Sequence, residues 1–373
     1  MISSYKKLSF SDIFGWQDND IYEYLPKSNN MFLSSSGRGG LEACIDLLGI
    51  NENESVLMPV LTAEGAVNPF YRKGVKVIFF DIKPNLEIDV DKIIKIIKVD
   101  SSIRCLFAIH YLGYPQNINE LKNICKKRGI FLIEDCAQAL FSKSIDGLPL
   151  GVHGDISLFS LAKTIPVIDG AIFFINSKKL NTVHIRYRYS IPGVLARVSI
   201  LLTLLLNNFI SQLKTSEIFW KLNSINKYIY SFYYKMLLKA KKPMKMSLIS
   251  KRIIKNINYE NIIINTKKNL RIFYKNIDKN RVNLLFKDLD PNVMLMGVPI
   301  ILNNRDDIYH KLRKKRIFCT IFDKHWNYIE KGKEDFFPNA KNVLDNVLII
   351  PITYKANSDE ILKMIKELNK LTI

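Results

Sequence analysis

Cysteine is scarce in this chain and follows no pairing pattern. The 373 residues include five cysteines, and none stands in the C-x-x-C spacing typical of zinc or redox-active dithiol sites. An odd number at irregular spacings argues against the disulfide framework of a small secreted protein. We therefore expect reduced thiols that mostly fill the core of a cytoplasmic protein, and we expect no metal site. The five are Cys44, Cys105, Cys125, Cys136 and Cys319.

Acidic residues are also few relative to basic ones. Lysine and arginine number 55 against 35 aspartates and glutamates, which gives a formal net charge of +20. Such an excess favours anionic partners such as nucleic acid, anionic lipid or phosphorylated metabolites. The basic residues are spread among many isoleucines and asparagines, and no basic motif interleaved with aromatics is visible. A composition bias explains the charge better than nucleic-acid binding does, so we predict no nucleic-acid partner.

Uninterrupted apolar segments long enough to span a membrane are lacking. The N-terminal sequence MISSYKKLSFSDIFGW has no apolar core of a signal peptide, so none is expected. The most apolar stretch, residues 191–213, reaches the necessary length of about 20 residues. It is interrupted by Arg197, Asn207, Asn208 and Gln212. We predict a buried or dimer-contact helix here, and an interfacial membrane helix is the less favoured alternative.

Hydrophobic residues are abundant, at 48%, and their order indicates the fold class. Short apolar runs alternate with segments of helical periodicity, which predicts βαβ units. We expect an α/β protein with a mainly parallel sheet and helices on both faces. A large domain is predicted over residues 1–245, with a helical Tyr- and Lys-rich segment at about 185–240, and a small α+β domain over 246–373. The predicted strands include SVLMPV, VKVIFFDI, IRCLFAIHY, GIFLIEDCA, DISLFSL and GAIFFIN.

Three features could carry chemistry, and each also has an ordinary structural explanation. Asp135 ends a predicted strand, where ligands of open α/β sheets bind, but aspartate is also a common helix N-cap. The turn SSSGRGG leads into a helix whose N-terminus can bind an anion beside Arg38, or it is simply a capped helix start. Lys163 lies 28 residues after Asp135 in the apolar run LFSLAKTIPVIDG. A desolvated lysine is a nucleophile, whereas a lysine in a loop often only snorkels to solvent.

Together, the anion cradle, the strand-end carboxylate and the lysine form one chemical set. Pyridoxal phosphate needs a cradle for its phosphate, a lysine for its aldehyde and an acid that keeps its pyridine nitrogen protonated. Neither a Walker lysine loop nor a G-x-G-x-x-G motif is present. The combination therefore favours pyridoxal phosphate over a nucleotide cofactor.

The same segments resemble the DegT/StrS-type aminotransferases, the sugar-aminotransferase branch of the fold type I pyridoxal-phosphate enzymes. The matching motifs are SGRGGLEACIDLLGI, ESVLMP, VIFFDI, IHYLGYPQNINEL, GIFLIEDCAQAL and GVHGDISLFSLAKTIPVIDGAIFF. The resemblance is strong over roughly residues 30 to 180 and weak over 245 to 373. It implies a homodimer that moves an amino group, usually from glutamate, to a keto group of a nucleotide-linked sugar. The products of such enzymes feed surface polysaccharide or related biosynthesis.

The resemblance also implies roles for the strand-end residues. Lys163 would bind the cofactor aldehyde covalently and then carry the proton between substrate and cofactor carbons. Asp135 would pair with the pyridinium nitrogen, and Gln138 would face the ring or its phenolic oxygen. Ser160 would bind the phosphate through its hydroxyl group.

Further residues match the family at the edges of the cofactor site. Gly37, Arg38 and Gly39 would supply the backbone cradle for the phosphate, and Thr62 would lie near the cofactor. His110 matches a family histidine at a strand end, and a direct role and a core role are equally open to it.

Two departures from the family pattern keep other functions open. The aromatic residue that usually stacks on the cofactor ring is Ala63 here, and KKPMKMS stands where the family often has an Asn that reaches the partner subunit's phosphate. One alternative is a pyridoxal-phosphate enzyme of non-transfer chemistry, such as a sugar dehydratase, although the retained Lys163 argues against the branch that replaces this lysine. The other is a catalytically inactive paralogue that binds a ligand.

Overall fold

A seven-stranded sheet organises the first half of the chain. The computed structural model describes residues 2–3, 8, 10–15, 17–28, 30–180, 185–213, 216–240 and 243–371. The strands of the sheet follow the spatial order β2-β8-β7-β6-β5-β3-β4. Their bounds are β2 Met31–Ser34, β3 Ser55–Pro59, β4 Lys76–Phe80, β5 Ile103–Ile109, β6 Phe131–Asp135, β7 Ile156–Ser160 and β8 Ala171–Ile175.

Five of these strands run parallel, and the two at one edge do not. β4, β3, β5, β6 and β7 pair in parallel, whereas β8 is antiparallel to β7 and β2 is antiparallel to β8. Parallel neighbours need a crossover of a dozen or more residues. Residues 161–170, which join β7 to β8, are too few for that and contain only the short helix α6 Leu161–Thr164. The connection therefore returns the chain beside β7 in the opposite direction.

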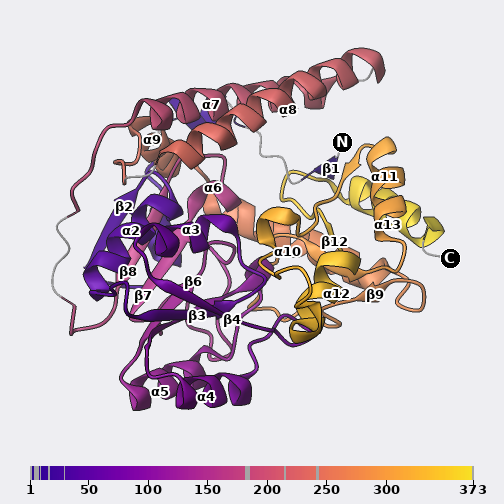
Figure 1. The fold of residues 1–373 in the computed structure, drawn as a ribbon. Coiled ribbons are helices and arrows are strands. Elements are labelled where there is room, and N and C mark those ends of the chain that lie inside the picture. Colours follow the sequence, from indigo (N-terminus) through magenta and orange to yellow (C-terminus); the bar gives the residue numbers. More distant parts are fainter. Residues whose placement is uncertain are drawn as a thin grey trace.

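Helices cover both faces of the sheet (Figure 1). Side chains of β5 alternate between the two faces: Leu106 packs against α4 Val90–Val99 and α5 Ile118–Arg128, while Phe107 packs in the core that includes α2 and α3. The helices of that second face are α2 Gly37–Leu48 and α3 Glu64–Arg72. A parallel sheet buried on both faces explains the nearly continuous apolar runs of the sequence, and it confirms the predicted fold class.

The C-terminal part contains a small antiparallel sheet of order β12-β10-β9, with α10 and α13 packed against each other. It agrees with the predicted α+β architecture.

The boundary predicted between residues 245 and 246 stays a prediction, because Ile253 and Ile262 share one core with Leu140 of the large sheet's domain. The remaining elements are β1 Ile2–Ser3, α1 Phe10–Phe14, α9 Leu248–Asn256, α10 Tyr259–Asn276, β9 Asn283–Leu284, β10 Val298–Ile301, α11 Arg305–Lys314, β11 Ile317–Phe318, α12 Pro338–Asn346, β12 Val347–Ile350 and α13 Ser358–Leu371, with short 3₁₀ turns at η1 Ile21–Tyr24, η2 Tyr111–Gly113, η3 Lys324–Trp326 and η4 Glu334–Phe336.

The Tyr- and Lys-rich segment forms a long helical hairpin at the top of Figure 1. Its helices are α7 Ile191–Gln212 and α8 Ser216–Lys239, which pack along each other. Among the described residues, one stretch, Ile191–Ile210 in α7, is long and apolar enough to cross a membrane by length and composition. Asn207 accepts a hydrogen bond of 2.6 Å from Asn226 inside the hairpin, so this polar residue of the apolar stretch has a structural role.

We predict that Gly40→Ala destabilises the protein. A Cβ atom at Gly40 would lie 2.1 Å from the ring of Phe173, which stacks on Phe32 with 4.8 Å between ring centroids. Overpacking of this kind costs about 1–3 kcal/mol, and chemical denaturation should show a loss in that range. In the control variant Gly37→Ala, on the same helix, the new Cβ would lie 3.9 Å from Leu158. Equal losses in the two variants would contradict the packing explanation.

Candidate functional site

A cavity of about 640 Å³ lies at the carboxyl ends of β6 and β7. The N-terminus of α2 and the turn α6 form one side of it, and residues of α7, α8 and η3 form the other. This is the edge of an open α/β sheet at which ligands bind. Among the predicted site residues, five line the cavity: Gly37, Arg38, Asp135, Ser160 and Lys163.

Asp135 and Lys163 influence each other's protonation across this cavity. Burial lowers the pKa of Lys163 below its ordinary value, and the negative charge of Asp135 counteracts part of that effect. Burial likewise raises the pKa of Asp135, while Lys163 and the N–H of Ala137, 2.8 Å from Asp135 Oδ1, act in the opposite direction. A lysine with a lowered pKa yields the neutral amine more readily, and the neutral amine is the form that attacks a carbonyl.

The N-terminus of α2 supplies positive potential to its part of the cavity wall. The side chain of Ser36 caps the helix by accepting a hydrogen bond from the N–H of Gly39 at 3.2 Å. The cap leaves the first amides, those of Gly37 and Arg38, at the helix end that attracts anions. The side chain of Arg38 is buried, and its Nε and Nη1 atoms have no hydrogen-bond partner. A buried guanidinium with unpaired donors is costly unless a ligand accepts from it, so this wall fits an anionic group such as a phosphate.

Four predicted residues do not line this cavity. The amide of Gly39 is already used by the Ser36 cap. Thr62 is fully buried and donates its hydroxyl to the carbonyl oxygen of Pro59. Gln138 accepts a 2.8 Å hydrogen bond from the N–H of Leu112 and lines a smaller hollow of about 80 Å³, which also borders Lys163. Their predicted contacts with a cofactor stay predictions.

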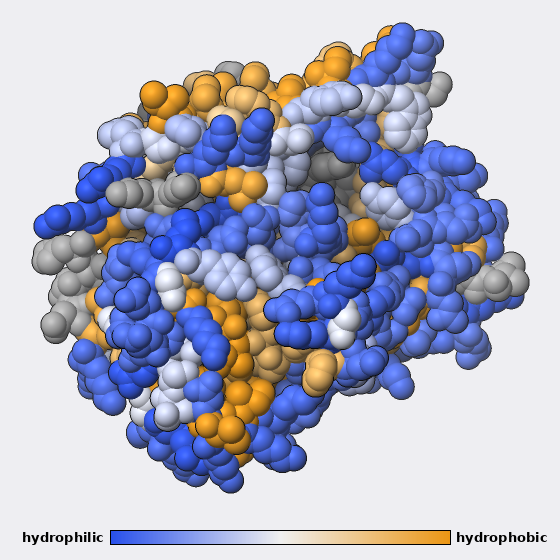
Figure 2. All heavy atoms as spheres, in the orientation of Figure 1, coloured by the Kyte–Doolittle hydropathy of each residue, from blue (hydrophilic) through white to orange (hydrophobic). Residues whose placement is uncertain are grey.

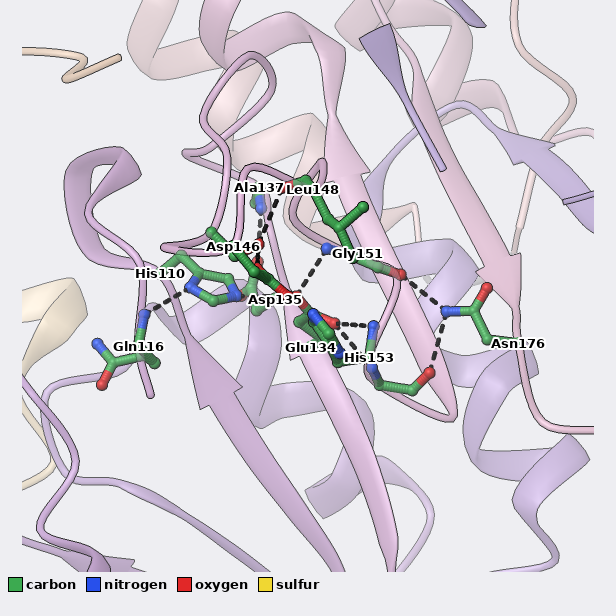
Figure 3. Close-up of polar contacts among 12 residues, drawn as sticks. His110, Gln116, Glu134, Asp135, Ala137, Asp146, Leu148, Gly151, His153 and Asn176 are labelled. Atoms are coloured by element: carbon green, nitrogen blue, oxygen red, sulfur yellow. Dashed lines mark hydrogen bonds and ion pairs between the residues drawn. The ribbon is translucent and has the colours of Figure 1, made fainter. Parts of the chain in front are cut away.

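The fourth, His110, belongs to a buried network centred on Glu134 (Figure 3). The N–H of Gln116 donates to Nδ1 of His110, so the proton of this imidazole is on Nε2, which lies 3.1 Å from Oε1 of Glu134. Glu134 also accepts hydrogen bonds from the N–H groups of Gly151 at 2.6 Å, His153 at 3.1 Å and Gly154 at 2.7 Å. The network thus ties the 150–154 loop to the strand that carries Asp135.

These hydrogen bonds decide the charge of Glu134. Burial alone would raise its pKa, but the bonds from His110, Gly154 and Gly151 outweigh burial and lower the pKa. His110, Glu134 and Cys136 lie close enough to one another to suggest a metal site. Both imidazole nitrogens and both carboxylate oxygens already have partners, however, so a structural role explains this group.

Several residues of the cavity escaped sequence reasoning because distant segments bring them there. Trp326 of η3 lines the cavity, and Nζ of Lys163 lies 5.6 Å from its ring centroid. Glu64 of α3 accepts from Tyr234 of α8 at 3.2 Å and lies 2.9 Å from Nδ1 of His325. The one usable signal was the absence of an aromatic at position 63, which left open whether another side chain covers the cofactor ring or that face is more open.

Asp169 was also missed, although it lies in the quoted run VIDGA. One of its oxygens lies 2.7 Å from Nε of Arg197 of α7, and the other accepts from the hydroxyls of Ser247 at 2.7 Å and Ser250 at 2.6 Å. Asp169 therefore joins the lysine-bearing connection to α7 and to α9. Ser247, the last residue of KKPMKMS, is the N-cap of α9.

In comparisons with known proteins, residues 19–193 match the model of the DegT/DnrJ/EryC1/StrS aminotransferase family. A GDP-perosamine synthase of Vibrio cholerae is 30% identical over 146 residues, which cover 38% of this chain and 39% of that protein. A GDP-perosamine synthase of Escherichia coli O157:H7 is 33% identical over 149 residues, covering 39% and 40%. The chain thus spans about two fifths of the length of the relatives it matches.

Solved structures extend the likeness of the fold over the whole chain. Spr1654 from Streptococcus pneumoniae, solved in a PLP-form, superposes with a TM-score of 0.72 at 13% identity, covering 100% of this chain and 98% of that one. PseC of Helicobacter pylori, an aminotransferase involved in the biosynthesis of pseudoaminic acid, superposes with a TM-score of 0.69 at 13% identity, covering 100% and 99%. At these identities the likeness concerns the fold alone.

We predict that Glu134→Gln lowers the free energy of unfolding at neutral pH by about 2–4 kcal/mol, because a buried carboxylate with four donors becomes an amide. Since the pKa of Glu134 is lowered in the folded state, its contribution is present above the ordinary value of 4.5 and is lost as the pH falls through the folded value. The difference between wild type and variant should therefore shrink in acid. Urea unfolding at several pH values measures it, with the exposed Glu120→Gln as control. A constant difference down to acidic pH would contradict the assignment.

We also predict that the amine of Lys163 is acylated at lower pH than a free lysine side chain, because burial lowers its pKa below 10.5. Asp135→Asn should shift the labelling profile further down, since the charge of Asp135 raises the pKa of Lys163. Mass spectrometry after brief acylation across a pH series, with Nα-acetyl-lysine amide as reference, measures both profiles. Identical profiles in the wild type and the Asp135→Asn variant would show that the two groups do not interact.

Proposed function

We propose that this protein is a pyridoxal-phosphate-dependent aminotransferase acting on a nucleotide-linked sugar, because residues 19–193 match the DegT/DnrJ/EryC1/StrS aminotransferase family model. The observation that carries the proposal is the position of Lys163. Its amine, with a lowered pKa, shares one cavity with the carboxyl group of Asp135 and with the buried guanidinium of Arg38, whose Nε and Nη1 atoms have no hydrogen-bond partner.

The residues present fit pyridoxal phosphate. The start of α2, with Gly37, Arg38 and the hydroxyl of Ser160, would hold the phosphate, and Asp135 would face the pyridine nitrogen. When bound, this cofactor supplies an electron sink that stabilises negative charge on the substrate carbon. Burial favours the protonated form of an isolated Asp135, and a cation beside it would favour the carboxylate, so Asp135 suits a positively charged partner.

Lys163 would hold the cofactor aldehyde and later move the proton. Its position in α6, directly after β7, keeps the amine within the cavity while the backbone is anchored by the sheet. Desolvation by the surrounding protein keeps the amine neutral more often than water would. A neutral amine can both attack a carbonyl and accept a proton, which are the two tasks that a transamination asks of this residue.

Trp326 supports the proposal because it supplies an aromatic ring to a cavity in which the family's usual aromatic is replaced by Ala63. Its ring lines the same cavity and lies 5.6 Å from Nζ of Lys163. We infer that Trp326 takes over the cover of the cofactor ring. An isolated bridge between Leu61 and Asn327 brings η3 next to the position where the family's own aromatic stands.

The substrate proposal draws on the relatives and on the charge of the cavity. The similar stretches in the two GDP-perosamine synthases point to a nucleotide-linked sugar as amino acceptor, and the family resemblance points to glutamate as donor. Lys227 adds a cationic side chain to a cavity that already contains Arg38, whereas the charge of Arg197 is paired with Asp169. Such a lining suits a diphosphate or a carboxylate. The product would feed polysaccharide or related biosynthesis.

Assembly and location belong to the same proposal. We propose a homodimer, as the family resemblance implies. A cytoplasmic location is supported by the five cysteines, all of which are free and buried in the structure, because reduced thiols persist in reducing compartments.

The first experiment is a visible absorption spectrum of the purified protein with added pyridoxal phosphate. In the wild type we expect an absorption band at a longer wavelength than that of the free cofactor. The band should be lost in Lys163→Ala. It should be kept in the control variant Lys178→Ala, which removes an exposed lysine. Adding glutamate should bleach the band, because amino transfer converts the cofactor to its amine form.

The other outcomes of this experiment distinguish the two alternative functions. A band that requires Lys163 but ignores glutamate would point to another donor or to non-transfer chemistry such as sugar dehydration. No band in the wild type would overturn the enzyme proposal in favour of a ligand-binding paralogue.

A further inference from the structure

The helix α7 presents an unbroken apolar stripe to solvent. Along its outward face lie seven residues that are each between 40% and 79% exposed: Ile191, Val194, Leu195, Val198, Leu202, Leu205 and Phe209. Their spacing of three and four residues places them on one face over five turns. No charged or polar residue interrupts this face, and Figure 2 shows it as apolar surface along the top edge of the molecule. Exposed apolar patches of this extent mark an interaction site.

The partner helix α8 carries a second, mixed pattern. Ile218, Ile225 and Phe232 recur every seven residues and are about half exposed. Three positions after each of them come Lys221, Tyr228 and Lys235, which form the neighbouring row of the helix surface. An apolar row beside lysine and tyrosine is typical of helices that lie in the interface between lipid and water.

The hairpin and the residues just before it are predominantly positive. Residues 185–240 contain eight lysines and arginines and a single acidic residue, Glu217. Arg186 and Arg188, just before α7, and Lys235 and Lys239 in α8 are exposed, whereas Lys227 lines the cavity.

The inner face of α7 ties the helix to the protein. Ala196, Ser199, Thr203 and Asn207 are buried there, and Arg197 makes the ion pair with Asp169. A spanning orientation would break the Asn207–Asn226 bond and open the cavity that the hairpin lines. The geometry therefore favours a helix that lies along a surface over one that crosses it.

We propose that the α7–α8 hairpin docks on an anionic lipid bilayer, with the α7 stripe inserted among the acyl chains and the basic side chains on the headgroups. The stripe offers no complementary charge to a protein partner, whereas the surrounding cations match anionic lipid. A second copy is the rival occupant. A two-fold contact would set the basic segment of one copy against the same segment of the other, and like charges that face each other disfavour it.

Co-sedimentation of the protein with lipid vesicles tests this surface, and it does not depend on the aminotransferase proposal. We expect binding to vesicles of phosphatidylcholine mixed with phosphatidylglycerol, little binding to phosphatidylcholine alone, and release at high salt. Val198→Glu should weaken binding roughly tenfold or more, since it removes apolar burial and places a carboxylate near anionic lipid.

The same substitution at Val99 is a matched control. Val99 is 89% exposed at the end of α4, on the opposite side of the molecule from the hairpin (Figure 1). Val99→Glu should bind as the wild type does, and circular dichroism should show that both variants fold.

Three outcomes would overturn the proposal. Equal binding of the wild type to neutral vesicles would remove the role of charge, and equal weakening by Val99→Glu would show that the stripe is not the docking surface. A wild type that ignores vesicles, but whose dimer separates in Val198→Glu by light scattering, would make the stripe a contact between copies.

Discussion

The buried carboxylate of Glu134 is the interaction on which the site depends. It gathers His110 from the end of β5 and the backbone of the 150–154 loop around the last residues of β6. A charge without these donors would be expelled from the core, and the loop without the charge would leave buried N–H groups unpaired. The carboxylate and its donors therefore require each other, and together they fix the position of the neighbouring Asp135.

Glu134 and Asp135 show how a strand gives neighbouring acids opposite properties. Successive side chains point to opposite faces of the sheet. Glu134 meets four donors and keeps its charge, whereas Asp135 meets one backbone N–H, that of Ala137, and the amine of Lys163, so that burial prevails and raises its pKa. One acid thereby holds the fold, and the other is left available to a ligand.

The sequence predicted the parallel strands well, because local apolar runs mark strands. It also put Asp135 at a strand end, as the structure has it, while the cofactor roles of Asp135 and Lys163 stay predictions. It could not predict that β8 runs antiparallel, since that depends on how ten residues turn. The orientations of Thr62 and Gln138 were also out of reach, because their polar atoms bond to nearby backbone. Trp326 enters the cavity from a segment more than 160 residues beyond Lys163, and no local pattern could place it.

The hydrogen bond between Asn207 and Asn226 has a consequence for the hairpin as a whole. Two apolar helices can slide or rotate against each other with little change in energy, and a single buried polar pair removes that freedom, because any other alignment strands both amides. The pair fixes the register of the two helices. It fixes the phase of α7, so that Arg197 always turns toward Asp169 while Val198, one residue on, always turns outward. Inner and outer surfaces of the hairpin are thereby set by one and the same alignment.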